Sequence, residues 1–485
     1  MERPNNIFNK NNEWANILCH EDTRTAQSVY ALFTGAEKLI EETSGNLQSL
    51  LDIERKICTE EKQEFNTMAH LIVKAAISKT RVMSLTEDTH IEIVVPMYHE
   101  RTRMAPRANS NCALLDNSFT PDINGEDALL RKVIEMEWLI KDSKLDYNLI
   151  FVDDICDQDS GGYASKLIEE NKLHKCKVLF LADEIKNTGH ESIKELAIQT
   201  ITDKGESIRG GSLCLGFAEA VTKTKQSEKK RNTMIGYVDA DSSYSLTQIG
   251  IPLLEIINSP RIQAMTASRQ HELTYMEPAK GESQTSHRSS GLIRLKQVVG
   301  YLRNTVVGRN VPADTQSGFK LFRPEILEKT LIQPNKAHNF SYDTQLLSRI
   351  SRLCPYRDSI KTFGVVCIDS DELSTANNGV TYFSALKIIQ TIAEEVDLSK
   401  QANEMWLLDF LTRDLDNYKL AIRLLDDKTD LSEWFFPYSE YYNSVTDLRA
   451  QIHTDRDTTA VGDYFTSEIC EKLEQILKKI SLQDL

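Results

Sequence analysis

Two carboxylates stand at the end of an apolar run in the middle of the chain. Residues 234–238 are predicted to form a buried strand, and Asp239 and Asp241 follow it directly. Side chains at positions i and i+2 of an extended chain project to the same side, so both carboxylates can reach one ion. Mg²⁺ and similar hard cations prefer such oxygen ligands, with phosphate oxygens completing the shell. The pair also fits a solvated strand end or a turn, so its interpretation depends on the surrounding sequence.

Two earlier predicted strands also end on polar side chains. The apolar runs over 91–96 and 147–152 lead into residues 96–100 and into the pair Asp153 and Asp154. Helical patterns alternate with these runs, which indicates a mainly parallel sheet under flanking helices. Active groups in such sheets collect at the carboxyl ends of the strands. The polar strand ends are therefore expected to line one crevice.

A glycine turn and two later acidic segments complete the pattern. Arg209 and Gly210 precede a predicted helix, where bare backbone N–H groups and the helix start favour a bound anion. Segments 314–322 and 341–347 each contain an aspartate beside aromatic and polar residues. Each piece alone also fits a plain loop, a helix cap or a structural contact, so their order along the chain is more informative than any one of them.

In this order and spacing, the pieces resemble glycosyltransferase family 2, the GT-A enzymes that use nucleotide-sugar donors. Segment 314–322 is similar to the Asp-Thr-Gln-x-Gly-Phe-Lys-Leu-Phe segment of the dolichyl-phosphate glucosyltransferase branch, and 341–347 resembles the segment that follows it there. The resemblance covers residues 90–370. It implies a GT-A type, Rossmann-like, mainly parallel sheet with flanking helices, and transfer of a sugar from a UDP- or GDP-sugar to an acceptor hydroxyl.

The resemblance also implies roles for individual residues. It assigns Asp239 and Asp241 to Mg²⁺ or Mn²⁺, which would neutralise the departing diphosphate. Asp314 is the implied base of an inverting reaction, and Asp343 is the second choice. Arg209 replaces the lysine that is common in the family and keeps its charge. The implied contacts to the nucleoside, the diphosphate or the sugar are Pro96, Tyr98, Glu100, Asp153, Asp154, Arg209, Gly210, Asp239, Arg269, His287 and Arg288.

The chain departs from that branch in several respects. No stretch approaches the length of uncharged apolar sequence that a membrane span needs, so a lipid-phosphate acceptor is not expected. A polar insert over 101–126 lies beside the expected nucleotide site, where it could act as a lid. Soluble enzymes of this fold include retaining ones, which need no base at Asp314, so the stereochemistry and the acceptor both stay open.

Apolar patterning and the resemblance divide the chain into three regions. The 485 residues divide into an N-terminal helical region (1–88), a glycosyltransferase domain (89–375) and a C-terminal helical region (376–485). The helical regions are candidates for shaping the acceptor site, for homo-oligomer contacts or for binding a partner protein. The net charge of −15 argues against binding to nucleic acid or to a membrane surface.

The cysteines and the N-terminus indicate a cytoplasmic protein. Nine scattered cysteines without a Cys-x-x-Cys pair suggest reduced thiols, and the polar N-terminus is no signal peptide. The ten histidines show no metal-type spacing with each other or with the cysteines, so no such metal site is expected from sequence.

Two other functions remain open. A sugar-phosphate nucleotidyltransferase would also use a nucleotide and Mg²⁺, but a glycine- and lysine-rich loop should follow its first strand, and residues 97–104 contain no glycine. A non-catalytic interaction protein on a GT-A scaffold would use the helical ends as its working parts. The joint presence of Asp154, Asp239, Asp241 and Asp314 argues against loss of catalysis.

Overall fold

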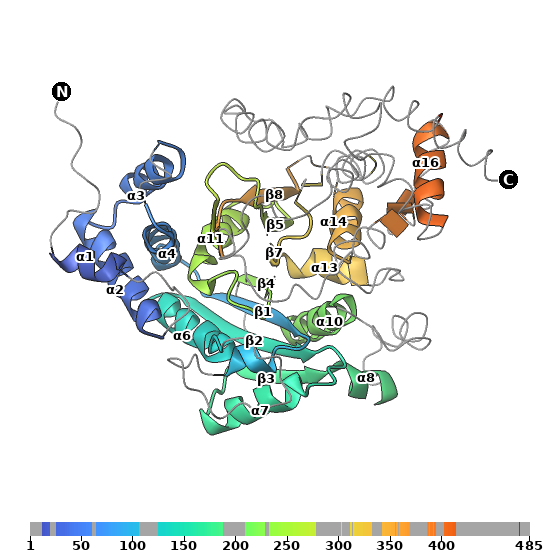
Figure 1. Ribbon diagram of the computed structural model, residues 1–485, viewed down its shortest axis with the longest axis horizontal. Helices are drawn as coiled ribbons and strands as arrows, with labels where there is room; N and C mark the ends of the chain where they lie inside the picture. The colour runs from blue at the N-terminus through green and yellow to red at the C-terminus, as the bar shows by residue number, and fades with distance from the viewer. Residues whose placement is uncertain are drawn as a thin grey trace, which may run out of the picture. The chain divides into compact units, whose positions relative to one another are not determined.

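The computed structural model describes most of the chain between residues 12 and 413. The described residues are 12–19, 26–60, 65–105, 125–187, 209–227, 232–277, 302, 311–312, 314–331, 342–354, 356, 358–368, 386–387, 389–390, 392–393, 402–413 and 475. Figure 1 shows the chain coloured from its N-terminus to its C-terminus. The chain divides into two compact units. Unit 1 comprises Met1–Ala279, Ser317–His338 and Lys361–Glu372, and unit 2 comprises Lys280–Gln316, Asn339–Ile360 and Leu373–Leu485.

A twisted sheet forms the centre of unit 1. Within the described residues its seven strands lie in the order β3-β2-β1-β4-β7-β5-β8. Strand β1 pairs in parallel with β2 and β4, and β2 pairs in parallel with β3, whereas β7 runs antiparallel to β4 and β5. The strands are β1 (Thr89–Met97), β2 (Leu145–Asp153), β3 (Cys176–Phe180), β4 (Asn232–Val238), β5 (Ala264–Ala267), β7 (Phe319–Phe322) and β8 (Ile360–Phe363). The predicted mainly parallel sheet with flanking helices is confirmed.

The register places the ends of the central strands at one edge of the sheet. Met97 of β1 lies opposite Asp153 of β2, and Val94 of β1 lies opposite Tyr237 of β4. Strand β1 is buried along nearly its whole length, as expected for a β-branched run inside a parallel sheet. It continues through Pro96 to Met97, one residue beyond the predicted end. The side chains that follow these strands therefore emerge side by side.

Helices cover the sheet, and several of them precede its first strand in the chain. Helix α10 packs so closely on β1 that a Cβ on Gly216 would lie only 2.3 Å from Val94 Cγ1. The helical elements of unit 1 are α1 (Asn12–Leu18), α2 (Ala26–Glu42), α3 (Leu47–Arg55), the π-helix η1 (Lys56–Glu60), α4 (Thr67–Met83), α5 (Arg101–Met104), α6 (Ala128–Ile140), α7 (Ser160–Glu170), α8 (Leu181–Asn187), α10 (Gly210–Gln226), η2 (Leu246–Gln248), α11 (Gly250–Asn258) and α13 (Pro324–Leu331).

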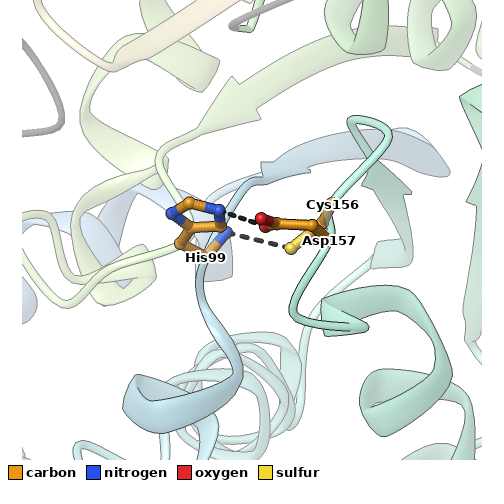
Figure 2. Close-up of side chains that lie close together, drawn as sticks. All are labelled: His99, Cys156 and Asp157. Carbon is orange, nitrogen blue, oxygen red and sulfur yellow. Dashed lines mark hydrogen bonds and ion pairs between the residues drawn. The ribbon is translucent and has the colours of Figure 1, made fainter. Parts of the chain in front are cut away.

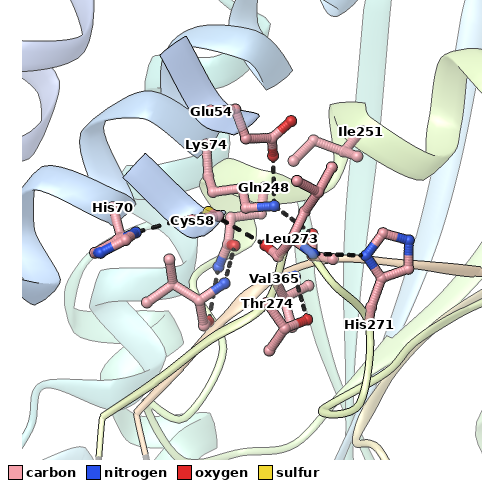
Figure 3. A network of polar contacts seen from close by, with 12 residues as sticks. Glu54, Cys58, His70, Lys74, Gln248, Ile251, His271, Leu273, Thr274 and Val365 are labelled. Carbon is pink, nitrogen blue, oxygen red and sulfur yellow. Dashed lines mark hydrogen bonds and ion pairs between the residues drawn. The ribbon is translucent and has the colours of Figure 1, made fainter. Parts of the chain in front are cut away.

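The N-terminal helices belong to the same compact unit as the sheet. A buried polar network joins α3 and α4 to the two-stranded sheet of β6 (Tyr275–Glu277) and β9 (Val366–Ile368) (Figure 3). In it, Lys74 forms a 2.5 Å ion pair with Glu54 and donates to the Gly364 carbonyl at 3.0 Å. The predicted division of the chain at residues 88 and 375 stays a prediction, since it follows sequence order rather than these compact units.

Unit 2 contains helices α14 (Tyr342–Leu353) and α16 (Ala402–Arg413). Helix α16 lies in the predicted C-terminal helical region (376–485), of which every residue after 413 except 475 lies outside the described residues. Most of the polar insert, residues 106–124, also lies outside them. In the part of the chain that the structure describes, no helix combines the length and the apolar character that a membrane crossing requires.

Candidate active site at the sheet edge

Asp154 and Asp239 are connected through Arg209. The carboxylate of Asp154 accepts the backbone N–H of Arg209, and the Ser212 hydroxyl donates to the same oxygen at 3.3 Å. The guanidinium of Arg209 forms an ion pair of 2.9 Å with Asp239 Oδ1. The end of β2, the start of α10 and the end of β4 therefore meet at one edge of the sheet. The sequence predicted this convergence from the alternation of strands and helices.

Arg209 is held in an uncommon backbone conformation. Its φ of +92° lies in the region that non-glycine residues seldom adopt. The guanidinium lies over the ring of Tyr237, with 5.6 Å from Cζ to the ring centroid. Tyr237 itself is buried and accepts a hydrogen bond of 2.8 Å from the Lys320 ammonium. The backbone N–H of Arg209 thus contacts Asp154 and its guanidinium contacts Asp239, at the start of a 17-residue helix.

Gly318 lies directly against the Asp239 carboxylate. Strand β7 pairs antiparallel with β4, so Gly318 stands beside the end of β4, and its carbonyl accepts the Asp239 backbone N–H at 2.9 Å. A Cβ at position 318 would come within 1.7 Å of Asp239 Oδ2, far inside any normal contact. The glycine in segment 314–322 therefore makes room for the first carboxylate of the pair.

Asp153 differs from Asp154 in its contacts. Its two carboxylate oxygens accept the backbone N–H groups of Cys156 at 3.0 Å and Gly161 at 2.8 Å. These bonds fix the loop between β2 and α7, which matches the capping alternative. Burial raises the pKa of Asp153. The predicted contact of Asp153 with a nucleoside stays a prediction.

Buried charges on and before α6 support the loop that carries Asp241. The ammonium of Lys132 donates to the Asp241 carbonyl at 2.7 Å. Glu126 and Glu135 accept backbone N–H groups from the same loop at 3.1 and 2.7 Å. Burial lowers the pKa of Lys132, with the nearby carboxylates opposing that shift. These side chains are not among the predicted site residues. Apolar periodicity does not report which charged residue of a helix is buried, so the sequence carries no signal for them.

Glu100 brings the end of β1 into the same electrostatic environment. Arg103 Nη1 donates to Glu100 Oε2 at 2.8 Å. Burial raises the pKa of Glu100 to about 7, Arg103 opposes the shift, and the charge of Asp241 adds to it. Pro96 and Tyr98, also predicted as donor contacts, lie half-buried at the end of β1 and just after it. All three strand ends thus contribute polar groups to one edge.

Replacing Glu100 by glutamine should remove a pH dependence of stability. A carboxyl whose pKa rises from 4.5 to about 7 on folding stabilises the fold below pH 4.5 and loses that contribution as pH rises through 7. The loss amounts to about 3 kcal/mol. Urea unfolding between pH 5 and 8 should show the wild-type chain losing stability relative to Glu100→Gln. Parallel stability curves for the two proteins would contradict the raised pKa.

The other predicted residues have different placements. Gly210 is buried at the start of α10, and Arg269 is half-buried two residues after β5. Asp314 and Asp343 are buried in unit 2, where the hydroxyls of their neighbours Thr315 and Thr344 lie 2.8 Å apart. His287 and Arg288 lie outside the described residues.

Comparison with known proteins found remote structural likenesses. No family profile and no curated protein matches the chain. Mannosyl-3-phosphoglycerate synthase from Rubrobacter xylanophilus is 11% identical, with a TM-score of 0.38 over 66% of this chain and 78% of that one. Glucosyl-3-phosphoglycerate synthase from Mycobacterium tuberculosis, in complex with phosphoglyceric acid, is 12% identical, with a TM-score of 0.36 over 67% and 85%.

A third solved structure is a mannosyltransferase from Pyrobaculum calidifontis in complex with GDP-Man and Mn²⁺. It is 10% identical to this chain, with a TM-score of 0.35 over 90% of this chain and 99% of its own. At these identities and scores, the likenesses do not identify a family for the chain.

Proposed function

We propose that the chain is a metal-dependent glycosyltransferase that moves a sugar from a UDP- or GDP-sugar to an acceptor hydroxyl. The observation that supports this most is the path Asp154–Arg209–Asp239, which joins three separate segments at the carboxyl edge of the sheet. Carboxylates suit ribose hydroxyls and a hard cation, and a guanidinium suits a diphosphate. A nucleotide-sugar presents all of these groups in one molecule.

Asp239 and Asp241 would hold Mg²⁺ or Mn²⁺. Both side chains are half-buried at the same strand end, and a site built of carboxylate oxygens fits a hard cation. Such an ion would neutralise charge on the leaving diphosphate. Gly318 accepts the Asp239 backbone N–H and Lys132 donates to the Asp241 carbonyl, so the backbone around this pair is fixed.

Arg209 and the start of α10 would bind the diphosphate. In the structure the guanidinium pairs with Asp239, and a phosphate oxygen is the natural competitor for that pairing once a cation occupies the carboxylate. Gly210 opens the helix, whose first N–H groups favour an anion. Arg269, His287 and Arg288 are proposed as further diphosphate contacts.

The remaining predicted residues are proposed to contact the nucleoside or to act on the acceptor. Asp154, Asp153, Glu100, Tyr98 and Pro96 are proposed to contact the base and ribose. Below pH 7, protonated Glu100 could donate a hydrogen bond to the base. Asp314 is proposed as the base that takes the acceptor proton if the reaction inverts, with Asp343 as the second candidate. The helical regions are proposed to shape the acceptor site or to form oligomer contacts, in a cytoplasmic enzyme.

A thermal-shift panel tests the proposal directly. UDP-, GDP- and dTDP-sugars are added with Mn²⁺, with Mg²⁺ or with chelator, and one donor should raise the midpoint only when metal is present. At a hundredfold excess over its dissociation constant, a ligand stabilises by about 2.7 kcal/mol. Asp241→Ala should abolish this shift and metal-dependent donor hydrolysis while the fold stays intact. Asp52→Ala, on the exposed face of α3, is the control that should change neither. An unaltered metal-dependent shift in Asp241→Ala would refute the metal assignment.

A further inference from the structure

A histidine, a cysteine and an aspartate meet beside the candidate active site. His99 follows β1, and Cys156 and Asp157 lie in the loop after β2 (Figure 2). One ligand atom from each residue lies within 4.8 Å of the other two. His99 Nε2 and Asp157 Oδ1 are 2.5 Å apart, and the His99 backbone N–H donates to Cys156 Sγ at 3.3 Å. The two segments are 57 residues apart in the chain and meet because β1 and β2 are parallel neighbours.

Imidazole, thiolate and carboxylate are together the ligand set of zinc. Each bond to Zn²⁺ measures about 2.0–2.3 Å, so two of its ligand atoms lie about 3–4 Å apart. The spacing of 2.5 Å between His99 Nε2 and Asp157 Oδ1 is below that range, and no ligand atoms of the cluster are more than 4.8 Å apart, so small side-chain rotations would suffice for binding. Sulfur and imidazole nitrogen favour a softer ion than the oxygen pair Asp239 and Asp241 does. The two places therefore differ in the class of metal that they select.

The cluster is positioned by contacts outside it. The Asp153 carboxylate accepts the backbone N–H groups of Cys156 and of Gly161 and so holds both ends of the loop. The Ser160 hydroxyl lies 3.1 Å from Cys156 Sγ, and the Tyr98 ring stacks on the His99 imidazole at 4.0 Å. Such outer contacts orient metal ligands and are part of a working site. The backbone around Cys156 and the ring of His99 are thus held by contacts that do not depend on a metal.

One side of the cluster faces solvent. The side chain of Asp157 is 79% exposed and that of His99 is 29% exposed. A metal ion held by three protein groups in such a position keeps a fourth place for water or an added ligand, as in open zinc sites. An ion could enter without a change in the fold.

We infer that His99, Cys156 and Asp157 bind a thiophilic transition-metal ion of the Zn²⁺ class, at a site separate from the one for Mg²⁺ or Mn²⁺. On binding, the Cys156 thiol releases its proton to solvent and its sulfur bonds to the ion. The imidazole bonds through one nitrogen and keeps its proton on the other. Asp157 exchanges its hydrogen bond with His99 for a bond to the metal.

Cobalt titration of the full reduced chain tests this inference. Co²⁺ substitutes for Zn²⁺, and a cobalt–thiolate bond gives a charge-transfer absorption that oxygen ligands do not. We expect this absorption in the wild-type chain and its displacement by Zn²⁺. Cys156→Ser should lose it completely, and His99→Gln should bind Co²⁺ at least tenfold more weakly. Circular dichroism of Cys156→Ser establishes that the loss is not unfolding.

Two controls separate this site from the other thiols and from the proposed catalytic metal. Cys176→Ser removes a half-buried thiol of β3 that is not in the cluster, and the absorption should remain. Asp241→Ala should also leave it unchanged, so failure of the glycosyltransferase proposal would not affect this result. Absence of the absorption from the wild-type chain, or its persistence in Cys156→Ser, would overturn the inference.

Discussion

Gly318→Ala should displace the Asp239 carboxylate and with it the metal-dependent binding of a nucleotide-sugar. The added Cβ would overlap Asp239 Oδ2, and the backbone at both positions is held by the pairing of β4 with β7. The side chain of Asp239 must therefore turn away and lose its ion pair with Arg209. Overpacking of this kind costs about 1–3 kcal/mol of stability. Urea unfolding measures the stability, and the thermal-shift panel with Mn²⁺ measures donor binding, which should be lost.

A double-mutant cycle isolates the cause of that effect. In Asp239→Ala the clashing carboxylate is absent, so adding Gly318→Ala to it should cost much less stability than adding it to the wild-type chain. Residues in contact commonly show coupling energies of about 0.5–3 kcal/mol. Here the double variant should be more stable than the sum of the two single stability changes predicts. Donor binding should stay lost, because the double variant still lacks the carboxylate. Additive stability changes would show that Gly318 is needed for some reason other than Asp239.

The sheet and the meeting of its polar strand ends were predictable because both follow from local patterns. The apolar runs that became β1, β2 and β4 are short, β-branched and separated by helical periodicity, which allows few arrangements besides a parallel sheet. A parallel sheet places the carboxyl ends of adjacent strands at one edge. The convergence of Asp154 and Asp239 thus required no knowledge of side-chain packing.

The supporting charges could not be predicted in the same way. Glu126, Lys132 and Glu135 look like ordinary members of an amphipathic segment, and apolar periodicity does not report which charged residue is buried. Their burial depends on the loop that follows Asp241, which packs on them from another part of the chain. Only the tertiary fold decides whether such a charge faces solvent or a backbone N–H group.

The His99–Cys156 pair shows the corresponding limit for metal sites. Spacing rules find ligands that lie close together in the sequence, as in zinc fingers. By that criterion the histidines and cysteines were predicted to form no metal site. The pairing of β1 with β2 brings residues from two loops together, so the signal lies in the register of the sheet. Loops that follow adjacent parallel strands are where such non-local ligand sets should be sought.

The largest effect on stability is expected from Lys74→Met. The side chains of Lys74 and Glu54 are only 2% and 5% exposed, and their charged atoms are 2.5 Å apart (Figure 3). Removal of the ammonium leaves a buried carboxylate without this partner and leaves the Gly364 carbonyl without this donor. Breaking one partner of a buried ion pair costs about 3–5 kcal/mol. Urea unfolding followed by tryptophan fluorescence should show this loss, since two of the four tryptophans, Trp14 and Trp138, belong to unit 1.

Two further variants determine whether the pair or only the lost partner matters. The double variant Glu54→Leu/Lys74→Met removes both charges, and replacing a buried ion pair by apolar groups is often neutral or stabilising. It should therefore recover most of the stability that Lys74→Met loses. Lys166→Met breaks the exposed pair with Glu170 on α7, where about 0.5 kcal/mol or less is expected. If Lys74→Met costs no more than Lys166→Met, the N-terminal helices do not depend on this pair to hold the β6–β9 sheet. A large loss that the double variant recovers would instead show that the loss of stability comes from the unpaired buried charge. The pair would then contribute more to the specificity of the docking of α3 and α4 than to its strength.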